Sequence, residues 1–198
     1  MNRMRICRGL PMRILFILIV LNCAVHAGEF QTSRPASWAQ PVPGVSLKNM
    51  FKVNRDVYRS KQPDEKDMAM LVAMGIRSVL NLRENHSDTD EAAGTELKLY
   101  RVPIETDKVS DAEIIAALRI LAECPKPVLV HCWHGSDRTG CVIAAYRIVF
   151  QGWSKADAIT ELEQGGYGYH ARTYPNITRY IRDMDVGEIR KQAGVSRP

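Results

Sequence analysis

Hydrophobic and polar positions along this chain follow two periods, one typical of strands and one typical of helices. Short apolar or alternating stretches predict strands at residues 50–53, 56–59, 76–82, 97–104 and 128–130. Longer stretches with apolar residues every three or four positions predict helices at residues 63–74, 111–122, 139–151, 154–164 and 175–184. Strands and helices that alternate in this way indicate an α/β fold, with a central mixed sheet flanked by helices.

Local signals mark where several of these helices begin and end. Pro63 and the acids behind it suit a helix start, and Gly75 ends that helix. Ser110 with Glu113 three residues later forms a capping-box pattern, so the next helix begins there. Ser154 is expected to cap the helix that runs to residue 164.

The first 27 residues have the pattern of an export signal. A stretch with four arginines and no acid precedes an apolar run at residues 14–21, and the valine and alanine at positions −3 and −1 before Gly28 suit signal peptidase. The apolar run is shorter than the roughly 20 residues that cross a membrane as a helix. We expect a signal peptide cleaved after Ala27 and a periplasmic or otherwise exported protein. An uncleaved N-terminal membrane anchor is the alternative.

The remaining chain has room for one folded domain. A chain of 198 residues is long enough for one well-buried domain and too short for two. Residues 28–45 contain Pro35, Pro41, Pro43 and Gly44, which predicts a flexible lead-in. The periodic elements fall within residues 46–186, which we expect to be the domain, and residues 187–198 are expected to form a tail.

Charge and cysteine content narrow the function. The net charge is +5, but four arginines belong to the export signal, so the rest of the chain has 23 basic and 22 acidic side chains. Nucleic-acid binding needs a basic face, and no such partner is expected. Three cysteines follow the signal, so at least one thiol stays unpaired. Whether Cys124 or Cys141 pairs with Cys132 under oxidising conditions is left open.

The segment between the strand at 128–130 and the helix at 139–151 combines the groups needed to bind and cleave a phosphate ester. It reads His131-Cys132-Trp133-His134-Gly135-Ser136-Asp137-Arg138-Thr139-Gly140. A loop between a strand and a helix N-terminus presents backbone N–H groups and the positive end of the helix dipole to an anion. The same field favours the thiolate of Cys132. The planar fork of Arg138 can hold two phosphate oxygens at once.

Each remaining position of the loop has an expected role. Gly135 permits tight curvature, and Thr139 donates its hydroxyl to the thiolate. His131 supports the loop by hydrogen bonding. The residues expected to bind the substrate are Trp133, His134, Gly135, Ser136, Asp137 and Arg138.

This segment matches H-C-x-x-G-x-x-R-[ST]-G, so the chain resembles the protein-tyrosine and dual-specificity phosphatases. Residues 58–63 (YRSKQP) resemble the Y-R-S-x-x-P element of small atypical dual-specificity phosphatases, and residues 78–83 resemble their following strand. Residues 146–153 resemble the helix after the loop in TpbA-type periplasmic tyrosine phosphatases. The resemblance covers residues 50–185 and implies a three-layer phosphatase fold, with the cysteine loop between a strand and a helix.

The resemblance also implies a general acid, an aspartate on an upstream mobile loop. Asp107 lies 25 residues before Cys132, at the position that matches the acid of the TpbA-type enzymes. Asp111 is the rival candidate. It directly follows the expected N-cap Ser110 and is explained equally well as a first-turn acid.

These observations predict a phosphatase that hydrolyses phosphotyrosine, and also phosphoserine or phosphothreonine, through a cysteinyl-phosphate. Its catalytic residues are Cys132, Arg138 and Asp107. No metal or organic cofactor is expected, because a structural zinc site needs four ligands and His131 and His134 have no second Cys/His pair at suitable spacing. The resemblance implies a phosphorylated protein as partner, such as a membrane-bound diguanylate cyclase.

Two other functions remain open. The first is an inositol-phosphate or phosphoinositide phosphatase, since atypical plant and fungal relatives include such activities. Polyphosphorylated substrates favour lysines in the loop, whereas this loop has Ser136 and Asp137, and an acid beside the arginine repels further phosphates. The second is a catalytically silent phosphotyrosine-binding module. The segment 165–174 either forms part of the pocket rim or packs its own aromatic side chains.

Overall fold

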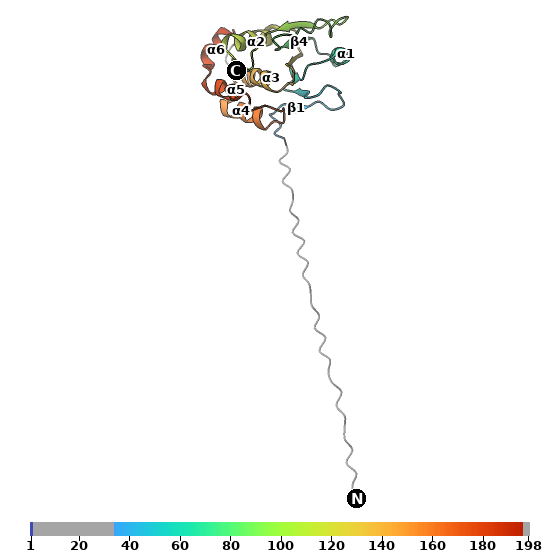
Figure 1. Cartoon of the computed structure of the whole chain (residues 1–198), viewed down its shortest axis with the longest axis vertical. Helices are drawn as coiled ribbons and strands as arrows, with labels where there is room; N and C mark the ends of the chain where they lie inside the picture. The colour runs from blue at the N-terminus through green and yellow to red at the C-terminus, as the bar shows by residue number, and fades with distance from the viewer. Residues whose placement is uncertain (2–33, 196–198) are drawn as a thin grey trace. The chain divides into compact units, whose positions relative to one another are not determined.

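In the part of the chain that the structure describes, six short strands form one mixed sheet at the centre of the fold (Figure 1). The computed structural model describes Met1 and residues 34–195, so the predicted export signal lies outside the described residues. The strands are β1 (Gln40–Pro41), β2 (Phe51–Lys52), β3 (Val57–Ser60), β4 (Ser78–Asn81), β5 (Lys98–Arg101) and β6 (Val128–His131). Their spatial order is β1-β2-β3-β6-β4-β5. Strands β3, β6, β4 and β5 are parallel, and β1 and β2 add an antiparallel edge.

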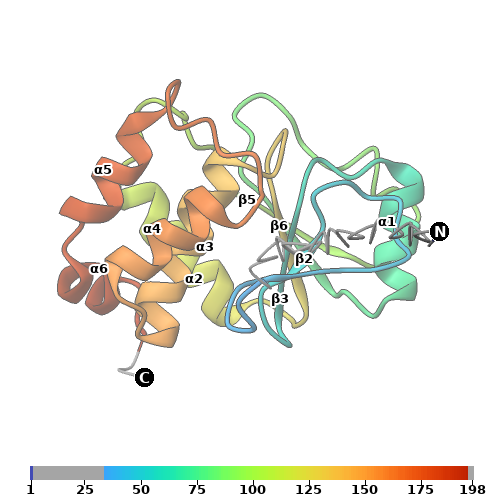
Figure 2. The ribbon, with the colours of Figure 1, turned by 90° about the horizontal axis from the view of Figure 1, so that it is seen from below.

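Helices cover both faces of this sheet. They are α1 (Glu65–Ala73), α2 (Asp111–Glu123), α3 (Asp137–Gln151), α4 (Lys155–Gln164), α5 (Pro175–Asp183) and α6 (Val186–Gln192). Figure 2 shows α1 on one side of the sheet and α2 to α6 on the other. The fold is thus α/β and three-layered, with a mixed sheet, as the sequence predicted.

The central strand β6 divides the core between the two faces. Successive side chains of a strand point to opposite sides. Leu129 accordingly packs in the smaller cluster with Met68 and Leu71 of α1, whereas Val128 and Val130 pack in the larger cluster with helices α2 to α6. Burial on both faces makes β6 a rigid platform for the residues that follow it.

Capping explains the helix starts. The side chain of Ser110 accepts a hydrogen bond from the Glu113 amide in a capping box, as predicted. Helix α1 begins two residues later than predicted, because a second capping box joins Asp64 and Asp67. Helix α3 begins at Asp137 rather than at residue 139, so the cysteine loop passes directly into the first helical turn.

The compact unit of the structure extends beyond both ends of the predicted domain. From Arg34 on, the expected flexible lead-in belongs to the compact unit, and the buried Ala39 amide donates to Glu161 at 2.6 Å. At the other end, α6 replaces the expected tail from residue 187, and its Ile189 is buried. Both segments are held by contacts with residues distant in sequence, which local composition does not reveal. Within residues 34–195, no helix has the length and apolar character needed to cross a membrane.

Candidate functional site

The predicted nucleophile lies at the junction between strand β6 and helix α3. Cys132 directly follows His131, the last residue of β6, and it is 2% exposed. The cysteine loop, residues 132–138, ends in the first turn of α3. The positive end of the α3 dipole and its unpaired N–H groups therefore lie at this loop, which suits an anion.

Two donors of the cysteine loop region lack partners. Arg138 Nε and Thr139 Oγ1 are buried and have no hydrogen-bond partner among the described residues. Arg138 Nη1 lies 3.8 Å from the Glu84 carboxylate, its only ion-pair contact within residues 34–195. Buried polar groups in native proteins are nearly always paired. Two unpaired hydrogen-bond donors near a thiol suit a ligand with acceptor oxygens, such as phosphate.

Gly135 gives the loop a shape that other residues cannot adopt. Its φ is +74°, in the left-handed region. A Cβ atom here would lie 2.4 Å from the backbone carbon and oxygen of Ser60. The Gly135 carbonyl accepts a hydrogen bond from Arg59 Nη2 at 2.8 Å. Strand β3 and the cysteine loop are thus in direct backbone contact.

Arg59 is a positioning residue that the sequence reasoning missed. It is 1% exposed, and its guanidinium lies 3.7 Å from the centroid of the Tyr167 ring. Burial lowers the pKa of Arg59 to about 10, although the nearby Tyr167 and Glu161 oppose this effect. The arginine occurs in the YRSKQP stretch noted above, but only the tertiary contact assigns it to the cysteine loop.

A buried carboxylate holds His131. Asp88 Oδ2 lies 2.8 Å from His131 Nε2, and its other oxygen accepts hydrogen bonds from Gln62 and Asn81, each at 2.9 Å. Burial raises the pKa of Asp88, but the hydrogen bond and charge of His131 outweigh it and lower the pKa below its ordinary value. His131 therefore has the supporting position expected of it. No sequence signal marked Asp88, which lies in an irregular stretch.

The side chains of Ser136 and Asp137 are turned toward the segment 165–174. Ser136 Oγ donates to the Tyr167 carbonyl at 2.7 Å. Asp137 accepts from the His170 amide and pairs with His170 Nδ1, each at 2.9 Å. A substrate can therefore contact the backbone groups of Ser136 and Asp137 but not their side chains. Because the Asp137 carboxylate is bound to His170, it repels further phosphates less than expected.

The segment 165–174 combines the two roles left open by the sequence. Tyr167 is 1% exposed and packs edge-on against Phe51, so it belongs to the core. His170 is exposed, and its ring centroid lies 5.7 Å from that of His134. The segment thus packs against the cysteine loop on its core side. His170 is its exposed residue next to His134.

Asp107 lies in an exposed turn between β5 and α2. The turn is tied to α5 by a hydrogen bond from Asn176 to the Thr106 carbonyl at 2.9 Å. Its neighbour Lys108 has a raised pKa, because Glu105 hydrogen-bonds and pairs with it and the charges of Asp107 and Glu84 add to the effect.

The charge of Glu84 acts on both Lys108 and Arg138. It contributes to the raised pKa of Lys108 and also approaches Arg138 at 3.8 Å. Asp107 itself has no hydrogen bond or ion pair with the cysteine loop among the described residues, so its role as the general acid stays a prediction.

The rival carboxylate, Asp111, has a structural contact. It is the first residue of α2, and it accepts a hydrogen bond from the Tyr180 hydroxyl at 2.7 Å. Burial and this carboxylate together raise the pKa of Tyr180. These contacts favour the helix-start role for Asp111 over proton transfer.

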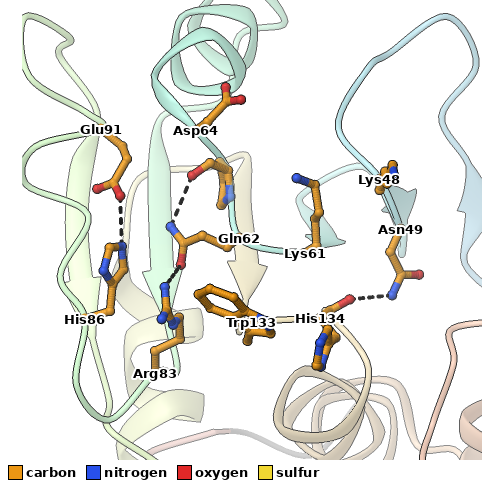
Figure 3. A pocket seen from close by; sticks show the side chains of 11 residues that line it. Lys48, Asn49, Lys61, Gln62, Asp64, Arg83, His86, Glu91, Trp133 and His134 are labelled. Carbon is orange, nitrogen blue, oxygen red and sulfur yellow. Dashed lines mark hydrogen bonds and ion pairs between the residues drawn. The ribbon is translucent and has the colours of Figure 1, made fainter.

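A pocket of about 610 Å³ lies beside the cysteine loop (Figure 3). We call it the flanking pocket, and it is lined by Lys48, Asn49, Lys61, Gln62, Pro63, Asp64, Arg83, His86, Glu91, Trp133 and His134. The Trp133 ring is 52% exposed and lies 4.2 Å from the Arg83 guanidinium. Trp133 and His134, predicted to line the substrate site, therefore form the boundary between the loop and this pocket.

One cluster of side chains in the described residues combines residue types that can bind a metal ion. Potential ligand atoms of His86, Asp88 and Glu91 lie within 4.8 Å of one another. Asp88, however, already accepts hydrogen bonds from His131 and two amides. His86 pairs with Glu91 at 3.0 Å. By hydrogen-bond geometry, however, His86 Nε2 and Glu91 Oε2 have no partner among the described residues.

Comparisons with known proteins agree with this geometry. The Tyrosine phosphatase family profile matches residues 45–190. Dual specificity protein phosphatase TpbA of Pseudomonas aeruginosa is 35% identical over 176 residues, which cover 86% of this chain and 78% of TpbA. Inositol diphosphatase DSP5 of Arabidopsis thaliana is 28% identical over 153 residues, 72% of each chain.

Solved structures give the same result. A crystal structure of TpbA superposes with a TM-score of 0.72 at 34% identity, covering 82% of this chain and 99% of that one. A cysteine-to-serine variant of TpbA in complex with phosphotyrosine gives a TM-score of 0.73 at 32% identity, covering 83% and 100%. The chain therefore belongs to the tyrosine phosphatase family, and it is a protein-tyrosine phosphatase.

Proposed function

We propose that the protein hydrolyses phosphotyrosine in proteins through a cysteinyl-phosphate intermediate. One observation carries this proposal. The buried thiol of Cys132 sits at the N-terminus of α3 together with two buried donors, Arg138 Nε and Thr139 Oγ1, that have no partner in the described chain. A bound phosphoryl group supplies the missing acceptors and places its phosphorus at the sulfur.

The first step transfers the phosphoryl group to the enzyme. The Cys132 thiolate attacks phosphorus, a sulfur–phosphorus bond forms, and the bond from phosphorus to the ester oxygen breaks. Asp107 gives its proton to the departing oxygen. Arg138 and the N-terminal amides of α3 hold the nonbridging oxygens as their charge is redistributed.

The second step returns the enzyme to its starting state. Asp107, now a carboxylate, takes a proton from water as the water oxygen attacks phosphorus. The sulfur–phosphorus bond breaks, inorganic phosphate leaves, and Cys132 becomes a thiolate again. The Thr139 hydroxyl, which has no partner within residues 34–195, is a donor that can stabilise this leaving thiolate.

Phosphotyrosine is supported as substrate by the relatives and by the rim. TpbA is named a dual specificity phosphatase, and its cysteine-to-serine variant holds phosphotyrosine. In this chain Trp133 places a half-exposed aromatic ring beside the nucleophile, which suits an aryl ester. Dual specificity extends the proposed substrates to phosphoserine and phosphothreonine.

An inositol polyphosphate is the second candidate substrate. It is favoured by the position of Asp137, whose carboxylate is bound to His170 and so does not face further phosphates. DSP5 and other relatives are named inositol diphosphatases.

Direct detection of the intermediate tests the mechanism. Wild-type protein is mixed with a phosphotyrosine peptide, quenched in acid within milliseconds and analysed by mass spectrometry. We expect a phosphate adduct on the peptide that contains Cys132, together with steady-state phosphate release. Binding without release identifies a silent binding module, and a clear preference for an inositol polyphosphate identifies the second candidate.

We also propose that the mature protein begins at Gly28, outside the cytoplasmic membrane, and acts on a membrane-bound signalling protein such as a diguanylate cyclase. The arginine-bearing and apolar pattern of residues 1–27 supports the location. N-terminal sequencing of the protein from fractionated cells tests it. A soluble cytoplasmic protein that retains residues 1–27 contradicts export, and phosphoproteomics of a deletion strain tests the partner.

A further inference from the structure

We propose that the flanking pocket is a subsite for a carboxylate of the substrate, supplied by an aspartate or glutamate adjacent to the phosphotyrosine. This inference rests on the proposed phosphotyrosine phosphatase activity and adds a sequence preference to it. Figure 3 shows Lys48 and Lys61 on the side of the pocket near Asn49 and His134.

The two lysines are held at the cysteine loop by backbone contacts. The Lys61 amide donates to the Lys48 carbonyl at 3.2 Å, and the next amide, of Gln62, donates to the Trp133 carbonyl at 3.1 Å. Asn49, beside Lys48, donates from its side chain to the His134 carbonyl at 2.9 Å. Both lysine-bearing segments therefore have a fixed position relative to the nucleophile.

Close packing strengthens this connection. A Cβ atom at Gly135 would lie 2.7 Å from the Lys61 amide nitrogen, so no side chain separates β3 from the loop. The Asn49 side chain also donates to the Tyr167 carbonyl at 2.9 Å, which already accepts from Ser136. The backbone of both lysine-bearing segments is thus adjacent to the loop that would hold a phosphotyrosine.

No carboxylate of the described residues pairs with the lysines of this wall. Neither Lys48 nor Lys61 forms an ion pair with another described residue, whereas Glu91 on the opposite side pairs with His86 at 3.0 Å. Arg83 donates to Gln62 at 3.0 Å and packs on Trp133. Lys48 and Lys61 are therefore the pocket cations whose ammonium groups have neither a hydrogen bond nor an ion pair within residues 34–195, while the Arg83 guanidinium is held by Gln62 and Trp133.

The remaining lining favours a single carboxylate over a group of phosphates. Asp64 and Glu91 line the same pocket, and their charges oppose a ligand with several negative groups. Pro63 and Trp133 add apolar surface that suits the methylene groups of a peptide side chain. A peptide with one acidic residue beside the phosphotyrosine meets both conditions.

The test compares two phosphotyrosine peptides that differ only in having glutamate or glutamine on both sides of the phosphotyrosine. We expect the glutamate peptide to have a kcat/KM about five- to tenfold higher at low salt, since two partly exposed ion pairs contribute about this much. The ratio of kcat/KM for the glutamate peptide to that for the glutamine peptide should fall toward one in 0.5 M salt. In the double variant Lys48→Gln/Lys61→Gln the ratio should fall toward one at low salt as well. Lys98→Gln, on the exposed strand β5, is the matched control and should keep the wild-type ratio.

The possible outcomes separate this inference from the proposed function. If both peptides are hydrolysed at equal kcat/KM, the subsite is wrong while the phosphotyrosine activity stands. If the glutamate preference persists in the double variant, another surface supplies it and the inference is also wrong. If neither peptide is hydrolysed and inositol hexakisphosphate is, the proposed function and the subsite fail together.

Discussion

His131 Nε2 lies 2.8 Å from Asp88 Oδ2, and this buried pair fixes the end of β6 from which the nucleophile projects. His131 is fully buried, and Asp88 is 5% exposed. The histidine directly precedes Cys132, so the pair holds the residue from which the cysteine loop starts. The pair therefore connects an irregular segment, residues 83–97, to the chemistry of the site.

We predict that Asp88→Asn lowers kcat/KM by about 10²-fold, the effect expected when reacting groups shift by about 1 Å. The new amide faces donors, because Asp88 Oδ1 accepts from both Gln62 and Asn81. The free energy of unfolding at pH 7 should fall by about 1–3 kcal/mol. Asp90→Asn, an exposed neighbour, is the control.

The effect of Asp88 on stability should depend on pH. Its folded-state pKa lies below the ordinary value of 3.8, so the stabilisation is present above pH 3.8 and is lost as the pH falls through the folded-state pKa. The stability difference between wild type and Asp88→Asn should therefore shrink between pH 5 and pH 2 in urea denaturation. A constant difference over this range contradicts the ionised role of Asp88.

We predict that Gly135→Ala lowers activity far more than Gly166→Ala, a substitution with similar backbone strain. Gly166 has a φ of +71° and open space within 4 Å of the position that an added Cβ would take, whereas a Cβ at Gly135 would clash with Ser60. Both alanine variants should lose about 1 kcal/mol of unfolding free energy from the left-handed backbone. Only Gly135→Ala should also lose at least about 10²-fold in kcat/KM. Similar kinetics for the two variants contradict the importance of this contact.

Asp107→Asn should slow substrates with poor leaving groups most. The p-nitrophenolate ion departs with little protonation, whereas the oxygen of phosphotyrosine or an alkyl ester needs a proton. We expect a loss of about 10²–10⁴-fold on the latter substrates and loss of the basic limb of the pH–rate profile. Steady-state kinetics on a leaving-group series measure this.

Asp111→Asn is the matched comparison for the acid. It should reduce the free energy of unfolding by about 0.5–1.5 kcal/mol through the hydrogen bond from Tyr180 and leave the pH profile intact. Tyr180→Phe should show the same loss, and the double variant should lose little more. A leaving-group effect in Asp111→Asn but not in Asp107→Asn places the acid at Asp111.

The three cysteines should differ in reactivity. Burial raises the pKa of Cys141 to about 12, so it stays a thiol at neutral pH and reacts slowly. Iodoacetamide at pH 6.5 should modify Cys132 first, and activity should fall in proportion to the modification. Mass spectrometry of digested protein measures this.

Cys132→Ser should remove turnover and retain phosphotyrosine binding. Residual turnover above about 1% of wild type contradicts a single nucleophile. Cys141→Ser is the control.

The segment 34–45 should contribute to stability. Arg34 donates to the Gly165 carbonyl at 2.8 Å and to the Tyr167 hydroxyl at 2.6 Å, and Ala39 is fully buried. A protein that begins at residue 46 should have a Tm at least about 5 °C below that of one beginning at residue 34, as a loss of 1–3 kcal/mol implies. Equal Tm values in calorimetry contradict the placement of the domain boundary at Arg34.

Local spacing was enough to predict the nucleophile, the phosphate-binding arginine and the elements on either side of them. Cys132 and Arg138 lie six positions apart, and an apolar strand and a helix flank them, so the arrangement is encoded in one short stretch. Capping at Ser110 and Ser154 could likewise be predicted, because a capping residue and its target amide are three positions apart.

The supporting residues could not be predicted in this way, because their partners are distant in sequence. Asp88 is 43 positions from His131, Arg59 is 76 from Gly135, and Arg34 is 133 from Tyr167. Such contacts depend on the order of strands in the sheet and on the path of irregular segments, which hydrophobic periodicity does not specify. The sequence by itself determined the candidate reacting groups, and the tertiary structure decided which buried charges lie against them.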